Sequence, residues 1–279
     1  MVMKRHKRIA ASATTYILLI IALVWTIFPV YWMIKSSITV NSEMYVARPS
    51  LIAKHYTFEN YVDLFTKTEF PRALLNSLMI AFLTTVCCLL ISILGSYAMT
   101  RLKYPGRRFF KTSIIFSYLI PTAVLFVPMY VFVSKLGFYD NKWALLIIYP
   151  TTVVPYCCYM LMSYFKAIPY ALEEAALIDG CTRMKSLRYI ITPIALPGIA
   201  VVATFAFTMS WNEYLYAMIM TTSPVQQTAV VAISSFKYAD SAIWGRIMAA
   251  SVLTSLPVTI IYIVAQAQLI SGKSDGSVK

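Results

Sequence analysis

Glu213 is the one acid inside an apolar segment, and it is the first candidate for chemistry in this sequence. It follows Trp211 and Asn212 and precedes Tyr214. Ionisable side chains at membrane depth mark solute or ion pathways, or pair with other charges between helices. We therefore expect Trp211, Asn212, Glu213 and Tyr214 to line the path of a polar solute. The alternative is a structural ion pair between Glu213 and Arg246, which falls near the start of the last apolar segment.

A second candidate group lies in a basic loop between two apolar segments and combines acidic with small residues: Glu173, Glu174, Ala175, Ala176, Asp179 and Gly180. Pro169 can occupy the first position of a helix, because its missing N–H costs nothing there. Gly180 can adopt the left-handed conformation that ends a helix. A second short helix is expected over 182–190, and Pro193 and Pro197 follow where the chain returns to the membrane. The spacing therefore predicts two short helices outside the membrane.

The first of these helices has a surface suited to docking. One face brings together residues at spacings of three and four, with small side chains at its centre: Leu172, Ala175, Ala176 and Asp179. Glu173 and Glu174 can pair with arginines of a partner. A loop that merely rests on lipid is the alternative, but anionic head groups would repel two glutamates. We therefore expect this helix to contact a partner protein.

The sequence carries no pattern that predicts an enzyme. The five cysteines do not have the spacing of metal ligands, and neither histidine lies near a cysteine in the sequence. The cysteines are Cys87, Cys88, Cys157, Cys158 and Cys181. Gly272-Lys273-Ser274 ends like a phosphate-binding loop, but Ala267 stands where the first glycine belongs and no strand is expected before it. We therefore expect the cysteines to pack as apolar residues and the chain to hold no metal and no cofactor.

Six apolar segments are long enough to cross about 30 Å of hydrocarbon, which takes about 20 residues. The chain is 59% hydrophobic and 13% charged, with a mean hydropathy of +0.70, and leaves too little polar sequence to cover six buried helices. The sequence therefore predicts an all-α membrane protein with six transmembrane helices over 13–34, 74–99, 112–133, 143–165, 198–220 and 244–269.

The positive charges predict the orientation of these helices. With the N-terminus inside, 15 of the 24 Lys and Arg fall on the cytoplasmic side. This distribution explains the net charge of +13 without nucleic acid. We expect a basic cytoplasmic N-terminus 1–12, a first membrane helix 13–34, an outer loop 35–73, a core 74–270 with a cytoplasmic loop 166–197, and a cytoplasmic tail 271–279.

The outer loop 35–73 contains a predicted amphipathic helix. The segment 56–65 has Thr57 as an N-cap, and Tyr61, Leu64 and Phe65 would share its apolar face. An interfacial helix and a contact for an external partner are the two interpretations.

The cytoplasmic loop resembles the EAA loop of the membrane subunits of binding-protein-dependent ABC importers. That loop has the pattern E-A-A, three residues, G, nine residues, I-x-L-P. Glu174-Ala175-Ala176, Gly180, Ile190 and Pro193 fall at these spacings, with Thr192 where leucine is usual.

Other segments are similar to the carbohydrate-uptake branch of these permeases, and to its shorter subunit as found in maltose and oligosaccharide transporters. The likeness runs from about residue 74 to the end of the sequence and rests on four short segments: Ser210-Trp211-Asn212-Glu213-Tyr214, Gln227-Thr228, Trp244-Gly245 and Leu256-Pro257.

This resemblance implies a type I importer permease in the bacterial inner membrane. Its expected partners are a second, different permease subunit, two ATPase subunits that bind ATP and Mg²⁺, an external solute-binding protein and the lipid membrane. Importers of amino acids, peptides or polyol phosphates share the EAA loop and remain an alternative. A secondary transporter is a further alternative. It would need ion-coupling groups at mid-membrane, and Glu213 is the one acid within the apolar segments.

The segment 221–243 joins the last two membrane helices. In the family that it resembles, this loop reaches toward the binding protein and helps to release the sugar. Gln227 and Thr228 offer uncharged hydrogen-bond partners, and Phe236 and Tyr238 offer stacking faces. We therefore expect these four residues to contact the binding protein, with Asn212 and Glu213 on the route below. An ordinary surface connection is the alternative.

Overall fold

The computed structural model describes residues 2–46, 48–236 and 244–274, which form helices and turns. The long helices are α1 (Val2–Ser37), α4 (Phe70–Arg101), α7 (Ala144–Ala167) and α14 (Trp244–Ser274). The described part of the chain contains no β-strand. It divides into two compact units, Met1–Thr68 with Ser235–Leu253, and Glu69–Ser234 with Thr254–Lys279. We call these the first and the second unit and describe each by itself.

Helices cover all six predicted membrane segments, but two of the segments are broken. Four helices are each long and apolar enough to span a membrane: Thr14–Ser37, Phe70–Arg101, Ala144–Ala167 and Trp244–Gln266. The predicted span 112–133 consists of α5 (Arg107–Leu119) and α6 (Thr122–Lys135), which meet at 99°. Pro121 causes this break, because the residue before a proline avoids the helical conformation, and Ile120 is extended.

The predicted span 198–220 is also not one continuous helix. It consists of α11 (Leu196–Trp211) and the short α12 (Leu215–Met220), separated by Asn212, Glu213 and Tyr214. A new helix starts here because the Glu213 carboxylate accepts hydrogen bonds from the N–H groups of Tyr216 and Ala217, at 3.0 and 3.1 Å. The acid found in the sequence therefore begins a helix.

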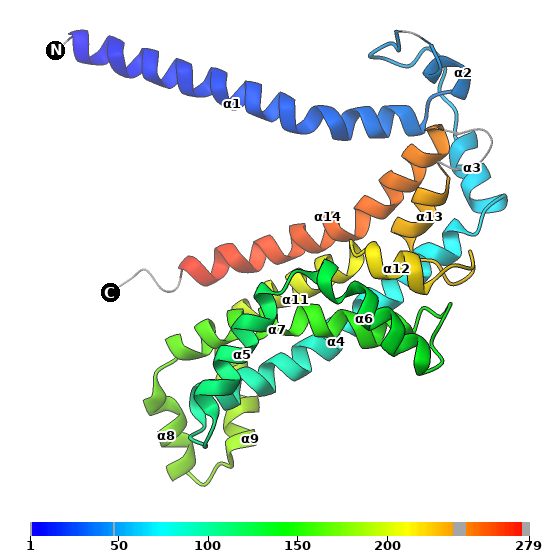
Figure 1. Cartoon of the computed structure of the whole chain (residues 1–279). Helices are drawn as coiled ribbons and strands as arrows, with labels where there is room; N and C mark the ends of the chain where they lie inside the picture. The colour runs from blue at the N-terminus through cyan, green and yellow to red at the C-terminus, as the bar shows by residue number, and fades with distance from the viewer. Residues whose placement is uncertain (1, 47, 237–243, 275–279) are drawn as a thin grey trace. The chain divides into compact units, whose positions relative to one another are not determined.

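The second unit is built on α4, α7 and α11, which pack side by side (Figure 1). Their shared core contains Cys88, Cys157, Leu161, Phe165 and Val202. The prediction that the cysteines pack as apolar residues is confirmed for Cys88, Cys157 and Cys158, which are buried, whereas Cys87 is exposed. The remaining helices of this unit are α8 (Tyr170–Ile178), α9 (Arg183–Ser186), α10 (Thr192–Ile194) and α13 (Ala229–Ser235).

The first unit contains the predicted amphipathic helix, as α3 (Glu59–Thr66), after the short α2 (Asn41–Met44). Phe58 is the N-cap in place of the predicted Thr57, although the Thr57 hydroxyl still accepts the N–H of Glu59 at 3.1 Å. The predicted apolar face is only partly right: α3 buries Asn60 and Leu64, whereas Phe65 is 52% exposed. The Asn60 amide donates to the carbonyls of Ser37 and Thr39 at 3.0 and 3.1 Å, so a polar contact ties α3 to the end of α1.

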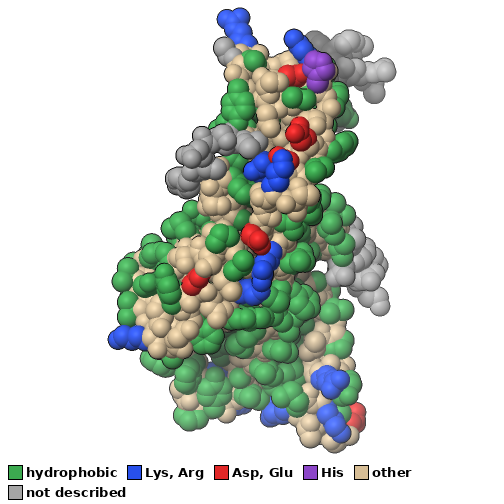
Figure 2. Space-filling model, turned by 90° about the vertical axis from the view of Figure 1, so that its right-hand side faces the viewer, with side chains coloured by type: hydrophobic (Ala, Val, Ile, Leu, Met, Phe, Trp, Pro, Cys, Tyr) green, Lys and Arg blue, Asp and Glu red, His purple; other side chains and the backbone are tan. Residues whose placement is uncertain are grey.

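Apolar side chains cover much of the face shown in Figure 2, with charged side chains in separate groups among them. In α1, none of the apolar membrane window is buried by the rest of the chain. These apolar surfaces are suited to lipid or to partner subunits, because water would not favour them.

Candidate functional site

The loop between α7 and α11 has the predicted two-helix form. Pro169 precedes α8, and Gly180 follows its end with φ +84°. The N–H of Cys181 donates to the carbonyl of Ala176 at 2.9 Å, and that of Gly180 to the carbonyl of Leu177 at 3.2 Å. This pair of bonds is the Schellman motif, which satisfies the last carbonyls of a helix and favours glycine at its left-handed position. The prediction for Gly180 is therefore confirmed.

The second short helix is also confirmed, with an irregular extension. The Thr182 hydroxyl accepts the N–H of Lys185 at 3.3 Å and caps α9. A π-helical turn, η1 (Leu187–Ile191), then leads through α10 to α11. Leu187 and Ile191 of this turn are buried in the core formed by α4, α7 and α11, so α9 is joined to the membrane helices by packed side chains.

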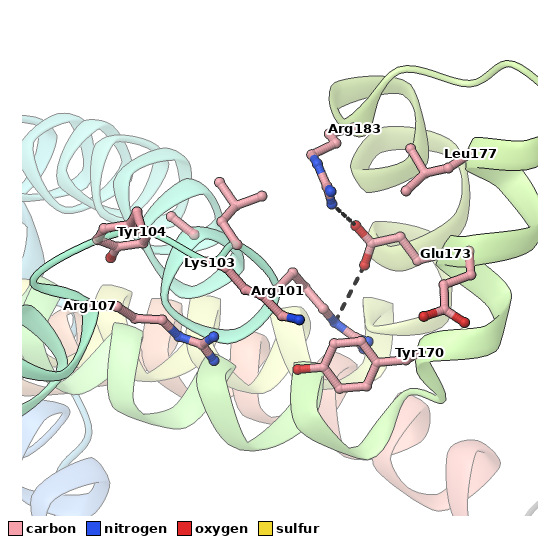
Figure 3. A pocket seen from close by; sticks show the side chains of 11 residues that line it. Arg101, Lys103, Tyr104, Arg107, Tyr170, Glu173, Leu177 and Arg183 are labelled. Atoms are coloured by element: carbon pink, nitrogen blue, oxygen red, sulfur yellow. Dashed lines mark ion pairs between the residues drawn. The ribbon is translucent and has the colours of Figure 1, made fainter.

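Glu173 has a different position from the one predicted. It is only 4% exposed, and its carboxylate accepts a hydrogen bond from the Tyr97 hydroxyl. Arg101 Nε lies 3.7 Å and Arg183 Nη1 lies 3.5 Å from its two oxygens. Figure 3 shows the carboxylate reaching between the two guanidinium groups. The expectation that Glu173 pairs with a partner's arginine is therefore wrong, because its charge is already paired inside the chain.

Arg101 fixes this cluster to the end of α7. Its Nη2 donates to the carbonyls of Phe165 and Ile168, the last turn of that helix. Its guanidinium also lies 4.2 Å from the centre of the Tyr170 ring, and the Tyr170 hydroxyl donates to the carbonyl of Thr100 at 2.6 Å. The end of α4 and the start of α8 are therefore held together by buried charges and hydrogen bonds.

The opposite side of α8 is open. Glu174, Ala175 and Asp179 are exposed, and Ile178 is 86% exposed. Of the four residues predicted to share a docking face, Ala176 is the exception, because it is buried against the chain itself. An exposed isoleucine beside acidic and small side chains is a surface that a partner protein could cover.

A cleft of about 930 Å³ opens between the end of α4 and α8 (Figure 3). Its charged lining includes Lys103 and Arg107, which the sequence linked only to membrane orientation. Arg107 donates to the carbonyls of Met99 and Thr100 at 2.8 and 2.9 Å, and so caps the end of α4. The sequence gives no sign of this cleft, because its walls come from two separate segments, 98–107 and 170–183.

A second cavity, of about 380 Å³, lies around the break between α11 and α12. It is lined by Asn212, Glu213 and Tyr214, as expected for a solute path. It also contains Tyr216, whose ring could stack on a sugar, and four residues that the sequence did not indicate: Thr122, Tyr149, Thr152 and Thr208. The lining of this cavity is mainly apolar, with a few hydroxyl, amide and carboxylate side chains among it.

Trp211 does not line this cavity. It is 2% exposed and stacks on Phe207 with ring centres 5.5 Å apart, and its indole N–H donates to the carbonyl of Thr254 at 3.1 Å. The helix ends at Trp211, so this side chain still follows the face of α11 that packs in the core. Its predicted place on the solute path is therefore wrong.

Glu213 and Arg246, considered as an ion pair, each have another partner within their own unit. Arg246 Nη2 lies 2.9 Å from the carboxylate of Asp63 in α3, within the first unit. The hydrogen bond from Lys67, together with Arg246, holds the pKa of Asp63 below its usual value. Glu213 instead binds the backbone at the start of α12.

The loop after α12 is tied down by hydrogen bonds to distant residues. The Asn76 amide donates to the carbonyls of Val225 and Gln227 at 3.1 and 2.9 Å. Asp140 accepts the backbone N–H and the hydroxyl of Ser223. The hydrogen bond from the Ser223 hydroxyl and that from its N–H lower the pKa of Asp140.

Only part of the predicted binding-protein contact can be placed on this loop. Gln227 is half-buried, and its amide donates to the carbonyl of Thr222 at 3.4 Å. Thr228 is 4% exposed, so it cannot offer its hydroxyl to an external protein in this conformation. Phe236 is half-buried, and Tyr238 lies outside the described residues.

The sequence of this chain matches a known protein family. Residues 91–273 match the model of the binding-protein-dependent transport system inner membrane component family. The chain belongs to this family. It is therefore a permease subunit of an ABC importer, a membrane-embedded transport component whose ATPase is a separate subunit.

Curated relatives match nearly the whole chain. It is 35% identical to the inner membrane ABC transporter permease protein YcjP of Escherichia coli over 99% of this chain and 100% of that protein. It is 33% identical to the trehalose/maltose transport system permease protein MalG of Thermococcus litoralis, over 91% of each chain. It is 32% identical to the sulfoquinovosyl glycerol transport system permease protein SmoH of Agrobacterium fabrum, over 93% of this chain and 91% of that protein.

Solved structures share the fold. A chain of a bacterial ABC transporter that imports the acidic polysaccharide alginate aligns with a TM-score of 0.81 at 22% identity, over 92% of this chain and 95% of that chain. A chain of the MetNI methionine ABC transporter aligns with a TM-score of 0.57 at 18% identity, over 73% and 96%. The fold is therefore that of an ABC importer permease.

Proposed function

We propose that this chain forms part of the membrane path of an importer for a sugar or oligosaccharide. The observation that carries the proposal is the kinship with permeases named for trehalose, maltose and sulfoquinovosyl glycerol, over nearly the full chain. The cavity around Glu213 is consistent with it, since hydroxyl, amide and carboxylate groups beside tyrosine rings suit a polyhydroxylated solute.

The expected complex contains a second, different permease subunit, two ATPase subunits and an external solute-binding protein. Both termini lie in the cytoplasm, in agreement with the distribution of Lys and Arg. ATP and Mg²⁺ bind to the ATPase subunits, whose closure reaches the membrane through α8 and α9.

The outward side of α8 is the proposed contact with the ATPase. Glu174 supplies the charge that can pair with an arginine of the partner, and Ala175 and Ile178 supply a surface for close approach. Glu173 does not form part of this contact surface; it links α8 to α4 and α9 within the chain. Asp179 and Gly180 set the turn that presents this surface.

Uptake by the reconstituted complex tests the substrate class. The chain would be purified with the subunits encoded beside its gene, placed in liposomes with the binding protein, and offered labelled disaccharides and labelled amino acids. We expect ATP-dependent uptake of a sugar, and Glu213→Ala should reduce it. Uptake of amino acids without any sugar would overturn the proposal.

Cross-linking tests the coupling contact. A cysteine at Ile178 should cross-link to the ATPase subunit, because this side chain is exposed on α8. A cysteine at Arg108, exposed in the first turn of α5, is the matched control. Equal cross-linking at both positions, or none at Ile178 in an active complex, would contradict the assignment of α8.

A further inference from the structure

A small cavity of about 240 Å³ lies in the first unit, beside the end of α1. It is half-open, and its lining combines two tryptophans and other apolar side chains with one serine and one lysine: Trp32, Lys35, Ser36, Met44, Pro49, Trp244 and Met248. It is distinct from the cleft at α8 and from the cavity at Glu213, both of which belong to the second unit.

Lys35 places a positive charge at this cavity. The residue is only 6% exposed, and its ammonium lies 4.6 Å from the centre of the Trp32 ring. Among the described residues it has neither an ion pair nor a side-chain hydrogen bond. The side chain borders the cavity, and one cation–π contact contributes only about 0.5–2 kcal/mol, so its charge gains from a counter-ion in the cavity. The cavity therefore favours a negatively charged ligand.

Two nearby acids are engaged elsewhere. Glu43 accepts the N–H of Lys54 at 3.0 Å and contacts His55 Nδ1 at 2.6 Å. Asp63 contacts Lys67 and Arg246. The contacts of these acids with other groups leave the Lys35 ammonium at the cavity without a carboxylate.

The position of Lys35 along α1 indicates where the anion comes from. The apolar membrane stretch of this helix is Thr14–Ser37, so Lys35 falls in its last turn, at the boundary of hydrocarbon and head groups. Tryptophans such as Trp32 and Trp244 are enriched at that level. Lipid phosphates lie there as well. The volume is below the roughly 300–1,000 Å³ of sites for larger ligands, so a head group fits better than an oligosaccharide.

We propose that this cavity binds the phosphate of an anionic phospholipid head group, with Lys35 as its ion pair and the rings of Trp32 and Trp244 at its sides. A lipid held there would connect the end of α1 to the first turns of α14. This connection matters because the rest of the chain buries none of the apolar membrane window of α1.

The first test measures lipid retention by native mass spectrometry of the full-length chain in its assembled complex. Phosphatidylglycerol is the probe, and phosphatidylcholine is the zwitterionic comparison. Lys35→Met should lower the affinity for phosphatidylglycerol about fivefold, the value of one lysine near an anionic surface. Lys35→Arg should restore it, and Lys54→Met, which removes an exposed lysine of the same unit, should leave it unchanged. Equal retention by wild type and Lys35→Met would overturn the proposal.

A second test needs no variant and remains decisive if Lys35→Met fails to assemble. Phosphatidylglycerol that carries a photoreactive group near its phosphate should cross-link to the segments that contain Met44 or Met248. Cross-links confined to other segments would overturn the assignment. Labelled inorganic phosphate is offered separately to the lipid-depleted complex. Binding of free phosphate that depends on Lys35, without any phosphatidylglycerol cross-link at this site, would show a soluble anion as the ligand and would also overturn it.

Discussion

Glu173 and Glu213 are two acids of the same unit that are stabilised in different ways. Glu173 is held by Tyr97, Arg101 and Arg183, side chains that are distant in the sequence. Glu213 is held by the backbone N–H groups of the third and fourth residues after it. The first acid therefore joins three elements into one block at the coupling loop. The second caps the helix that follows a break in a membrane segment and lines the cavity beside that break.

The largest expected effect follows from removing Arg101, the buried cation that pairs with Glu173. Arg101→Ala leaves a buried carboxylate without its buried partner and removes two bonds to the end of α7, which should destabilise the folded state by about 3 kcal/mol or more. Thermal unfolding of the purified complex measures the loss. The matched control is Arg183→Ala, whose side chain is 56% exposed and whose contribution should be below about 1 kcal/mol. Equal losses for the two variants would contradict the view that burial makes the difference.

The second effect concerns the cavity around the break between α11 and α12. Glu213→Ala removes the acceptor for two N–H groups at the start of α12 and should cost about 1 kcal/mol in stability, as expected for a lost helix cap. Glu213→Gln keeps one acceptor oxygen and should retain much of that stability while removing the charge. If uptake falls in Glu213→Gln at near-normal stability, the charge serves transport. If uptake and stability fall only together, the residue serves the helix break alone.

The third effect tests the turn that presents α8. Gly180 has φ +84°, and a Cβ built there meets no atom within 4 Å, so a substitution acts on the backbone alone. Gly180→Val should strain the turn by about 1–2 kcal/mol and reduce uptake while the subunit still inserts. Gly180→Asn is the control, because asparagine tolerates the left-handed conformation. Normal uptake by Gly180→Val at normal expression would contradict the proposed coupling role.

Features governed by neighbours in the sequence were predictable. Pro169, Thr182 and Gly180 act within one helical turn, so their types and spacing were enough to place α8 and α9. The membrane segments were predictable from length and apolar composition alone. The break at Pro121 was missed because a proline within a long apolar run is compatible with either a kinked or a broken helix.

Features that depend on packing between distant segments were not predictable. Glu173 and Glu174 are adjacent acids, and only the position of Arg101 in the folded chain decides that one is buried and the other exposed. Trp211 was assigned to the cavity by its proximity to Glu213 in sequence. The end of α11 falls between them, so Trp211 packs in the core while Glu213 turns to α12. Sequence spacing could not reveal this division without knowledge of where the helix ends.

The smallest expected effect is a dependence on pH at the loop that follows α12. Bonds from the hydroxyl and N–H of Ser223 lower the pKa of Asp140 in the folded state. A lowered folded-state pKa means that the stabilisation is present above the unfolded value of about 3.8 and is lost as the pH falls through the folded value. Ser223→Ala should therefore lower the thermal midpoint slightly at pH 7, and the difference from wild type should shrink as the pH is lowered toward 3. Ser223→Ala introduced into an Asp140→Asn background should give a midpoint difference, relative to Asp140→Asn alone, that changes less with pH, because the titrating group is gone. If the Ser223→Ala difference stays constant across this range, the hydrogen bonds to Asp140 do not depend on its charge, and this loop is held by Asn76 and the backbone alone.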